Sequence, residues 1–290
     1  MKDFSDYKKA LVFAAWGAGG GVVSGISFDL LLREPLEPYH WPSVTAWFGT
    51  FGAFISVALL VGQSWYFQRG VQLPQALRAG VLPGFLAGAI ASAIAQTVYS
   101  INYTEFLRVV AWTVAGSLLG FGISRHIPNL GHWRGLGGGA AGGCLGGCLF
   151  IALSALLTDF YGRFLGLGII AFFIGLMIIL AEKMFQKAEL IVHWTPIKQG
   201  SMSLGETPIS LGSSKKSDIF LIGDGDFPET AGTIHVRDGR IVFENLMERH
   251  TSDLRHGDQF EFGGLRFEIR TDQQPEGPSD DLLDQITLLE

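Results

Sequence analysis

The sequence has few charged residues for its length. Only 17% of its 290 residues are Asp, Glu, Lys or Arg, whereas an average soluble domain has roughly 25%. Hydrophobic residues make up 48% of the chain, and a soluble fold of this size has too little polar surface to cover them. This composition excludes a protein made only of soluble domains.

The sequence also lacks the patterns of common catalytic and metal sites. It has no HExxH pair and no Walker lysine motif, the short patterns that mark zinc proteases and nucleotide-binding loops. Its two cysteines, Cys144 and Cys148, have no further soft ligands nearby to complete a metal site. We interpret them as apolar filling of a helix face, and we expect no catalytic residues, no metal and no cofactor.

Charge and glycine divide the chain near residue 187. Through Lys187 there are 12 Lys and Arg against 8 Asp and Glu, and 28 glycines; the remainder has 9 against 19, and 11 glycines. The first part therefore carries a net charge of +4 and the second −10. We predict a membrane domain at 1–187, a β-sandwich at 188–270 and an acidic, disordered tail at 271–290.

Six apolar stretches are long enough to cross a membrane as helices, which takes about 20 residues each. The only acidic residues inside a stretch are Asp29 and Glu182, each near its end, and the Arg residues sit at the borders. No ionisable group is therefore expected at mid-membrane, where carriers commonly place one. Gln63 and Gln96 are interpreted as hydrogen-bonding residues between helices. The stretches are 10–32, 44–67, 78–100, 107–124, 135–157 and 164–182.

The positions of Lys and Arg predict the orientation. With the N-terminus inside, the inner segments hold nine cations and the outer loops only Arg33, Arg108 and Arg163, and cations are retained on the cytoplasmic side. We therefore expect a multi-pass protein of the cytoplasmic (inner) membrane with both termini in the cytoplasm. The first span is longer than a signal-peptide core and no small-residue cleavage site follows it, so we interpret it as retained.

The cations also recur along the chain. Arg78 and Arg134 open the third and fifth spans, 56 residues apart, and Arg125 and Lys183 close the fourth and sixth, 58 apart. Such spacing predicts three helical hairpins around a pseudo-threefold axis, although transporters carry repeats too.

Glycines at every fourth position predict close helix contacts, because helices in lipid associate where small residues let backbones approach. This glycine-zipper pattern leaves open whether the contacts lie within the chain or between subunits. The residues are Gly17, Gly21 and Gly25 in the first span and Gly135, Gly139, Gly143 and Gly147 in the fifth, with a parallel row at Gly138, Gly142 and Gly146.

After Lys187 the pattern changes to short runs rich in β-branched and aromatic residues. These runs include ELIVHW, SMSLGE, PISLG, DIFLIG, GTIHVRDGRIVFENL and DQFEFGGLRFEIR. The Asp-Gly pair inside VRDGR favours a tight hairpin turn. Strands this close together predict a sandwich or barrel.

Two phrases of this part resemble those of forkhead-associated (FHA) domains. ISLGSSKKSDIFL, from Ile209 to Leu221, is similar to the family's opening phrase, and LRHGDQFEFGGLRFEI, from Leu254 to Ile269, to its closing one. The resemblance implies a β-sandwich that binds phosphothreonine peptides.

The phosphate-binding residues that the resemblance implies are largely missing. Ser213 follows Gly212 where the family has an arginine, the family's histidine position falls on Ala231, and we assign His235 to the next strand. Gly212, Ser213, Ser214, Lys215 and Lys216 form the candidate binding loop; without the guanidinium they hold an anion weakly or form a solvated turn.

These observations predict a noncatalytic membrane anchor or scaffold whose degenerate FHA-like module contacts a protein partner. The expected surroundings are membrane lipids, that partner, and a homo-oligomer or larger membrane complex; the acidic second part argues against nucleic acid. Two alternatives stay open: phosphothreonine-peptide recognition through the divergent loop, and a channel or transporter subunit with a regulatory β module. The end of the tail, DDLLDQITLLE, is either solvated or a short amphipathic helix that forms on docking.

Overall fold

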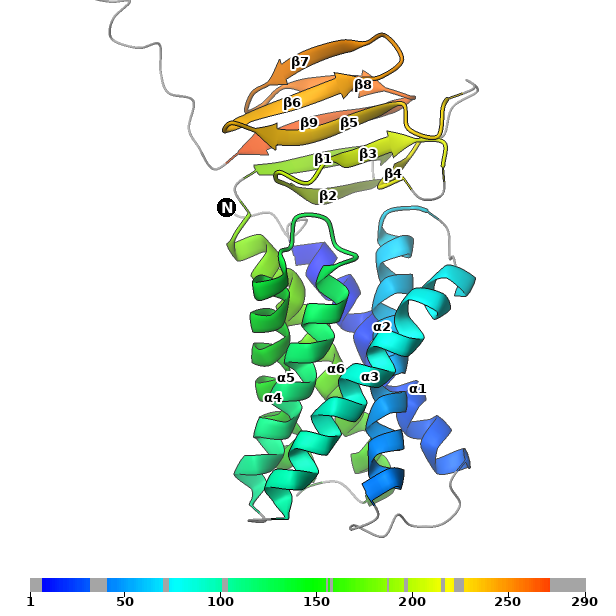
Figure 1. Cartoon of the computed structure of the whole chain (residues 1–290), viewed down its shortest axis with the longest axis vertical. Coiled ribbons are helices and arrows are strands. Elements are labelled where there is room, and N and C mark those ends of the chain that lie inside the picture. Colours follow the sequence, from blue (N-terminus) through cyan, green and yellow to red (C-terminus); the bar gives the residue numbers. More distant parts are fainter. Residues whose placement is uncertain are drawn as a thin grey trace, which may run out of the picture. The chain divides into compact units, whose positions relative to one another are not determined.

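The computed structural model describes residues 7–31, 41–69, 73–100, 104–154, 156, 159–186, 188–195, 198–214, 217–221 and 227–271. The chain divides into two compact units, Met1–Phe185 and Gln186–Glu290. The first is helical and the second is built from β-strands (Figure 1). A helical domain followed by a small β domain is the predicted fold class.

The helical unit contains six helices that are long and apolar enough to cross a membrane, which confirms the six predicted spans and a multi-pass membrane protein. Each begins within five residues of its predicted start. The helices are α1 (Lys8–Leu31), α2 (Trp41–Tyr66), α3 (Leu73–Tyr99), α4 (Glu105–Ser124), α5 (His132–Ser154) and α6 (Asp159–Met184).

Local sequence explains the connection between α4 and α5. Thr104 caps the N-terminus of α4 by accepting a hydrogen bond from the Leu107 backbone N–H, as Thr commonly does at this position. The turn after α4 contains Asn129 and Gly131, both with positive φ, a conformation that these two residue types tolerate best. The turn therefore reverses the chain at low cost.

The six helices form a closed ring. Each helix packs against the next one in the chain, and α6 packs against α1. One cluster of buried apolar side chains fills the centre of the ring, including Phe51, Ile55, Leu119 and Ile174, all at most 2% exposed.

The β unit is made of two sheets. The four-stranded sheet has the order β2-β1-β9-β8 and the five-stranded sheet β4-β3-β5-β6-β7. Side chains of both sheets that are fully buried, such as Leu190, Leu211, Ile234 and Phe267, form the core. The strands are β1 (Ala188–Thr195), β2 (Lys198–Leu204), β3 (Ile209–Gly212), β4 (Ile219–Phe220), β5 (Gly232–Arg237), β6 (Arg240–Asn245), β7 (His250–Leu254), β8 (Gln259–Phe262) and β9 (Leu265–Thr271).

The hairpin predicted at VRDGR is confirmed. Arg237 in β5 pairs with Arg240 in β6, and the two residues between them, Asp238 and Gly239, have φ of 50° and 77°. Two successive positive φ values match the twist of the flanking strands. His235 lies in β5, as predicted, whereas β7 is a strand that none of the predicted runs contained.

Candidate functional site

The two glycine rows of α5 face two different neighbours. In the first row, a Cβ atom at Gly135 or Gly139 would overlap the backbone carbonyl of Gly120 or Gly116 in α4. In the parallel row, a Cβ atom at Gly138 or Gly142 would overlap backbone atoms of α6. Both rows therefore meet helices of the same chain. Gly143 and Gly147 continue the first row against Trp112 of α4.

Close backbone contacts recur at equivalent places around the ring. In the α6–α1 pair, Gly17 and Gly21 lie against the carbonyls of Ala171 and Leu167, and Gly25 lies against Phe164. In the α2–α3 pair, Gly52 and Gly84 lie against each other's backbone. Together with α4–α5, these are the pairs that join one predicted hairpin to the next, so the glycines hold the three hairpins to each other.

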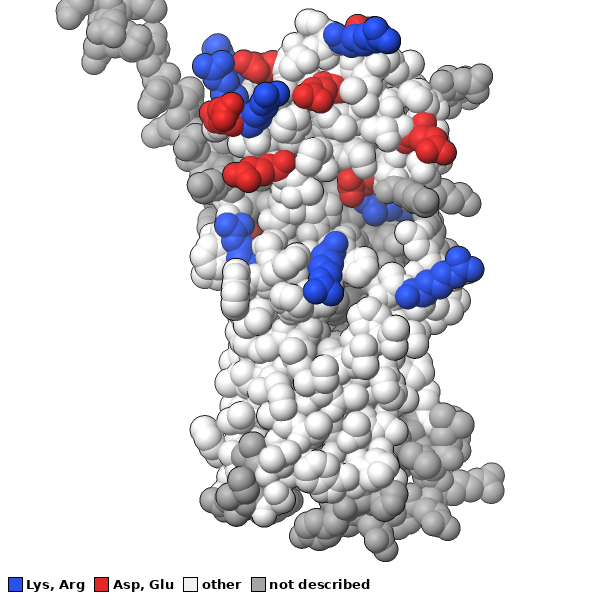
Figure 2. All heavy atoms as spheres, in the orientation of Figure 1, with Lys and Arg blue, Asp and Glu red and all other residues white. Residues whose placement is uncertain are grey.

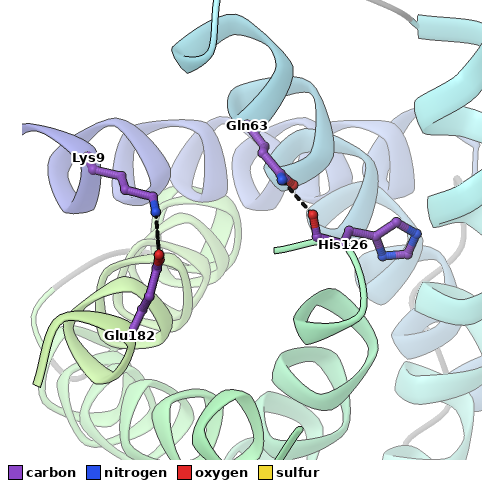
Figure 3. Close-up of polar contacts among 4 residues, drawn as sticks. All are labelled: Lys9, Gln63, His126 and Glu182. Atoms are coloured by element: carbon purple, nitrogen blue, oxygen red, sulfur yellow. Dashed lines mark hydrogen bonds and ion pairs between the residues drawn. The ribbon is translucent and has the colours of Figure 1, made fainter. Parts of the chain in front are cut away.

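An ion pair joins the first and last helices at one end of the ring. The Lys9 ammonium donates to both carboxylate oxygens of Glu182, at 2.6 and 2.7 Å (Figure 3). The side chains are only 7% and 3% exposed, and the ammonium also lies 5.6 Å from the centre of the Phe67 ring. Glu182, which the sequence places near the end of the last span, is therefore half of a buried pair that joins the first and last helices of the ring.

The turn after α4 is attached to α2 at the same end. Gln63 donates through Nε2 to the backbone carbonyl of His126, 2.5 Å away (Figure 3). The His126 ring is exposed on one side, but desolvation by neighbouring atoms lowers its pKa; a hydrogen bond with the Gly122 backbone opposes this and the Arg125 charge adds to it. The other predicted glutamine, Gln96, donates across helices to Thr45 of α2, 3.1 Å away, as expected.

Cations surround this end of the helical unit, and several lie over aromatic rings: Arg69 over Phe67, Arg125 over Phe121, Arg134 over Phe185 and Lys183 over Tyr7, at 4.8–5.5 Å. On the face drawn in Figure 2, the described part of the helices beyond these cations is free of Lys, Arg, Asp and Glu. Aromatic side chains in this position cover the hydrocarbon stems of the Lys and Arg side chains at the edge of an apolar band.

The predicted anion-binding loop of the β unit is hydrogen-bonded to the segment before β5. Ser213 Oγ donates to the carbonyls of Phe227 and Pro228, at 2.7 and 3.2 Å, and a Cβ atom at Gly212 would overlap the Glu229 carbonyl. Ser214 accepts a backbone hydrogen bond from Ser217. Lys215 and Lys216 lie outside the described residues. The Ser213 hydroxyl hydrogen is thus committed to the backbone instead of an anion.

A groove opens at one side of the β unit because the sheets differ in strand number. β8 is the last strand of its sheet, and its side chains stack on β6 of the other sheet. β7, which lies beyond β6, is faced by no strand in the part of the chain that the structure describes. The resulting groove of about 510 Å³ lies between β7 and β8, and the outer edge of β8 has no ladder partner among the described strands.

Phenylalanine rings line the groove and connect it to the core. The fully buried Phe267 stacks on Phe260, and Phe260 stacks on Phe243. Phe243 also meets Phe262 edge to face. The ring centres in these contacts are 5.0–5.2 Å apart. Phe227 adds a ring beside Phe262, at 6.4 Å. A concave, partly buried aromatic surface beside a strand edge without a ladder partner is typical of a peptide-binding groove.

The rim of the groove is preformed by the turn between β6 and β7. The Asn245 side chain accepts from the backbone N–H groups of Met247 and Glu248 and donates to the Glu248 carboxylate, at 3.1–3.3 Å. The turn presents two large apolar side chains to solvent, Leu246 at 48% and Met247 at 51% exposure, but only Met247 lines the groove. The sequence did not predict this groove, because one wall of it is β7, a strand that none of the predicted runs contained.

Within the described residues, no three His, Cys, Asp or Glu side chains lie close enough together to hold a metal ion. Comparison with profiles of known protein families gives no match, and neither does comparison with curated proteins.

Proposed function

We propose that the protein is a noncatalytic membrane anchor whose β unit binds a protein partner in the groove between β7 and β8. The observation that carries the proposal is the row of Phe243, which is buried, and Phe260 and Phe262, which are partly buried, lining a groove beside a strand edge that has no ladder partner among the described strands. An extended peptide gains main-chain hydrogen bonds from such an edge and specificity from side-chain pockets beside it. The FHA resemblance is part of the proposal only in that it implies a binding module.

The helical unit supports the anchoring part of the proposal. Its ring is closed by glycine contacts and a buried ion pair, and its centre is packed with apolar side chains. We propose that the end bearing Lys9 and Arg125 faces the cytoplasm, because cations near short loops are retained there. This orientation places the β unit in the cytoplasm of a cell whose inner membrane holds the ring.

The experiment compares two neighbouring substitutions on the same turn. Tagged full-length chain is purified in mild detergent from membranes of the cell that makes it, as wild type, Met247→Glu and Leu246→Glu, and bound proteins are quantified by mass spectrometry. Both substitutions add one charge to an exposed side chain, but only Met247 lines the groove. We expect the partner to be lost at least ten-fold with Met247→Glu and retained with Leu246→Glu.

A third variant separates the groove from the predicted phosphate-binding loop. Ser213→Ala with Ser214→Ala removes two hydroxyls of that loop, and the partner is expected to stay bound. Loss with this variant and retention with Met247→Glu would move the binding site to the loop. Equal capture by all forms, or capture by none, contradicts the proposed function.

A further inference from the structure

The pairing of β8 with β9 shows which side chains suit a strand that lies against β8. Leu265 and Phe267 of β9 lie opposite the two phenylalanines of β8, and between them Arg266 lies opposite Glu261. Arg266 donates to the Glu261 carboxylate at 3.3 Å. Since successive side chains of a strand point to opposite faces, β9 meets β8 with an apolar, a cationic and an apolar residue in turn.

The outer edge of β8 offers the same side chains to a second strand. Phe260, Glu261 and Phe262 all line the groove, and this edge has no ladder partner among the described strands. Opposite charges on directly opposed residues stabilise a strand pair, and like charges destabilise it. A strand added here therefore fits best when its apolar side chains alternate with Lys or Arg, as those of β9 do.

The charge of the groove favours the same partner. Of the twelve described residues that line it, Glu248 and Glu261 are carboxylates and none is Lys or Arg. Glu248 accepts from the Asn245 amide at 3.1 Å, a neutral donor that does not cancel its charge. The pair of Glu261 with Arg266 is more than half exposed on both sides, so it is weak, and the carboxylate has lone pairs for a second donor.

We infer that the partner segment of this groove is an extended, cationic strand in which apolar residues alternate with Lys or Arg. The inference rests on the proposed function and adds the chemistry of the partner. In this arrangement the apolar side chains meet the phenylalanine rings and Met247, and the cations meet Glu248 and Glu261. The net charge of −10 after Lys187 steers cationic segments toward the β unit and repels acidic ones.

The test uses three synthetic peptides and the full-length chain in a neutral detergent. The peptides are eight residues long, capped at both ends and fluorescently labelled, and they alternate Val or Phe with one variable residue, which is Lys, Gln or Glu. Fluorescence anisotropy at physiological salt gives their dissociation constants. We expect the Lys peptide to bind at least ten-fold more tightly than the Glu peptide, with the Gln peptide between them.

Two double variants show whether the carboxylates of the groove cause this preference. Glu248→Gln with Glu261→Gln removes the two charges that line the groove and is expected to reduce the preference for Lys over Glu at least five-fold. Glu206→Gln with Asp253→Asn removes two exposed charges that do not line it and is expected to leave the preference unchanged. This control is closely matched, because Asp253 lies in β7 and, like Glu261, forms an exposed ion pair with an arginine.

Hydrogen exchange shows where the peptide binds. The bound Lys peptide is expected to slow exchange of the β8 amides that point away from β9 at least ten-fold, because it supplies acceptors to them. The amides of β2, at the opposite edge of the same sheet, are expected to exchange at an unchanged rate.

A Glu peptide that binds as tightly as the Lys peptide overturns the inference and assigns the groove a partner of other chemistry. No binding of the Lys peptide, an equal loss of preference in the two double variants, or unchanged exchange in β8 also overturns it. The proposed function is tested apart from these measurements, by partner capture with Met247→Glu and Leu246→Glu. It stands if that comparison succeeds while the peptides fail, and it falls with the inference if both fail.

Discussion

The helical unit is closed and the β unit is open. In the helical unit every helix has two neighbours in the ring, and α6 returns to α1; the buried charges Lys9 and Glu182 satisfy each other there. In the β unit the four-stranded sheet ends at β8, whose outer edge pairs with no other described strand, and partly buried phenylalanine rings line the groove beside it. The helices of the first unit therefore pack against one another all the way round, whereas the second unit leaves one strand edge and the aromatic groove beside it open among the described residues.

This difference separates residues that maintain the fold from residues that meet a partner. Where glycines bring the helices of the ring together, the backbones touch, and an added side chain would overlap the neighbouring helix. The groove rim instead carries exposed side chains whose replacement removes little packing. Substitutions in the ring are therefore expected to act on stability, and substitutions at the rim on binding.

Breaking the ion pair that closes the ring is expected to have the largest effect. Glu182→Leu leaves the Lys9 ammonium buried without its counter-charge, which typically costs about 3–5 kcal/mol. Adding Lys9→Leu to this variant removes the unpaired charge and is expected to restore much of the lost stability. The midpoint of unfolding in mixed detergent micelles measures both, with exposed Lys8→Leu as the control. If Glu182→Leu alone were as stable as wild type, the ring would close without the ion pair.

The β unit is expected to show both behaviours, loss of stability at a buried core residue and little change at an exposed residue of the groove rim. Phe267 is fully buried and stacks on Phe260, so Phe267→Ala is expected to cost about 3–5 kcal/mol. Met247 is 51% exposed, and Met247→Ala is expected to change stability by no more than about 0.5 kcal/mol. Hydrogen-exchange protection of the β1 and β9 amides measures both. Comparable losses would mean that the groove rim is structural.

The stability lost when a glycine of α5 is replaced is expected to depend on the helix face that the glycine occupies. Gly139→Val forces a side chain against the Gly116 backbone, and overpacking of this kind costs about 1–3 kcal/mol or more. Gly137 lies two residues earlier on the same helix and has nothing within 4 Å of its would-be Cβ, so Gly137→Val is the matched control. Thermal stability in detergent distinguishes them, and equal stability of the two variants would remove the α4–α5 contact as a source of closure.

The smallest expected effect is a pH dependence at the turn after α4. Desolvation lowers the pKa of His126 below its ordinary value of about 6.5, so the unfolded chain binds more protons between the two values. Stability is therefore expected to fall as the pH drops below about 6.5, with no further change from this group below its folded pKa. His126→Gln flattens that slope in unfolding midpoints measured across pH 5–8. An identical slope in wild type and variant assigns the dependence elsewhere.

Most of the helical unit could be predicted from sequence because its signals are local. Length and hydropathy placed the six spans, and the four-residue glycine spacing marked the faces of α5 that meet α4 and α6. The pairing of Lys9 with Glu182 could not be predicted, since it requires that the first and last helices be neighbours. Orientation in the membrane and the pseudo-threefold relation stay predictions.

The β unit was predicted less completely because its site depends on strand order. Alternating apolar runs and Asp238-Gly239 marked most strands, but β7 reads HTSDL and has no apolar alternation to reveal it. Nothing in the sequence distinguishes Phe243, Phe260 and Phe262 from other aromatic residues of separate strands. They form a groove only because β8 ends its sheet opposite β6 while β7 continues the other.

The closure between α1 and α6 has a consequence for biosynthesis. Lys9 and Glu182 are 173 residues apart in sequence, and translation at about 5–20 residues per second separates their synthesis by on the order of 10–30 s. During that interval α1 sits in the bilayer with Gly17, Gly21 and Lys9 still without their α6 contacts. The ring is completed only when the last helix inserts, so a chain truncated within α6 exposes a ready association surface on its first helix.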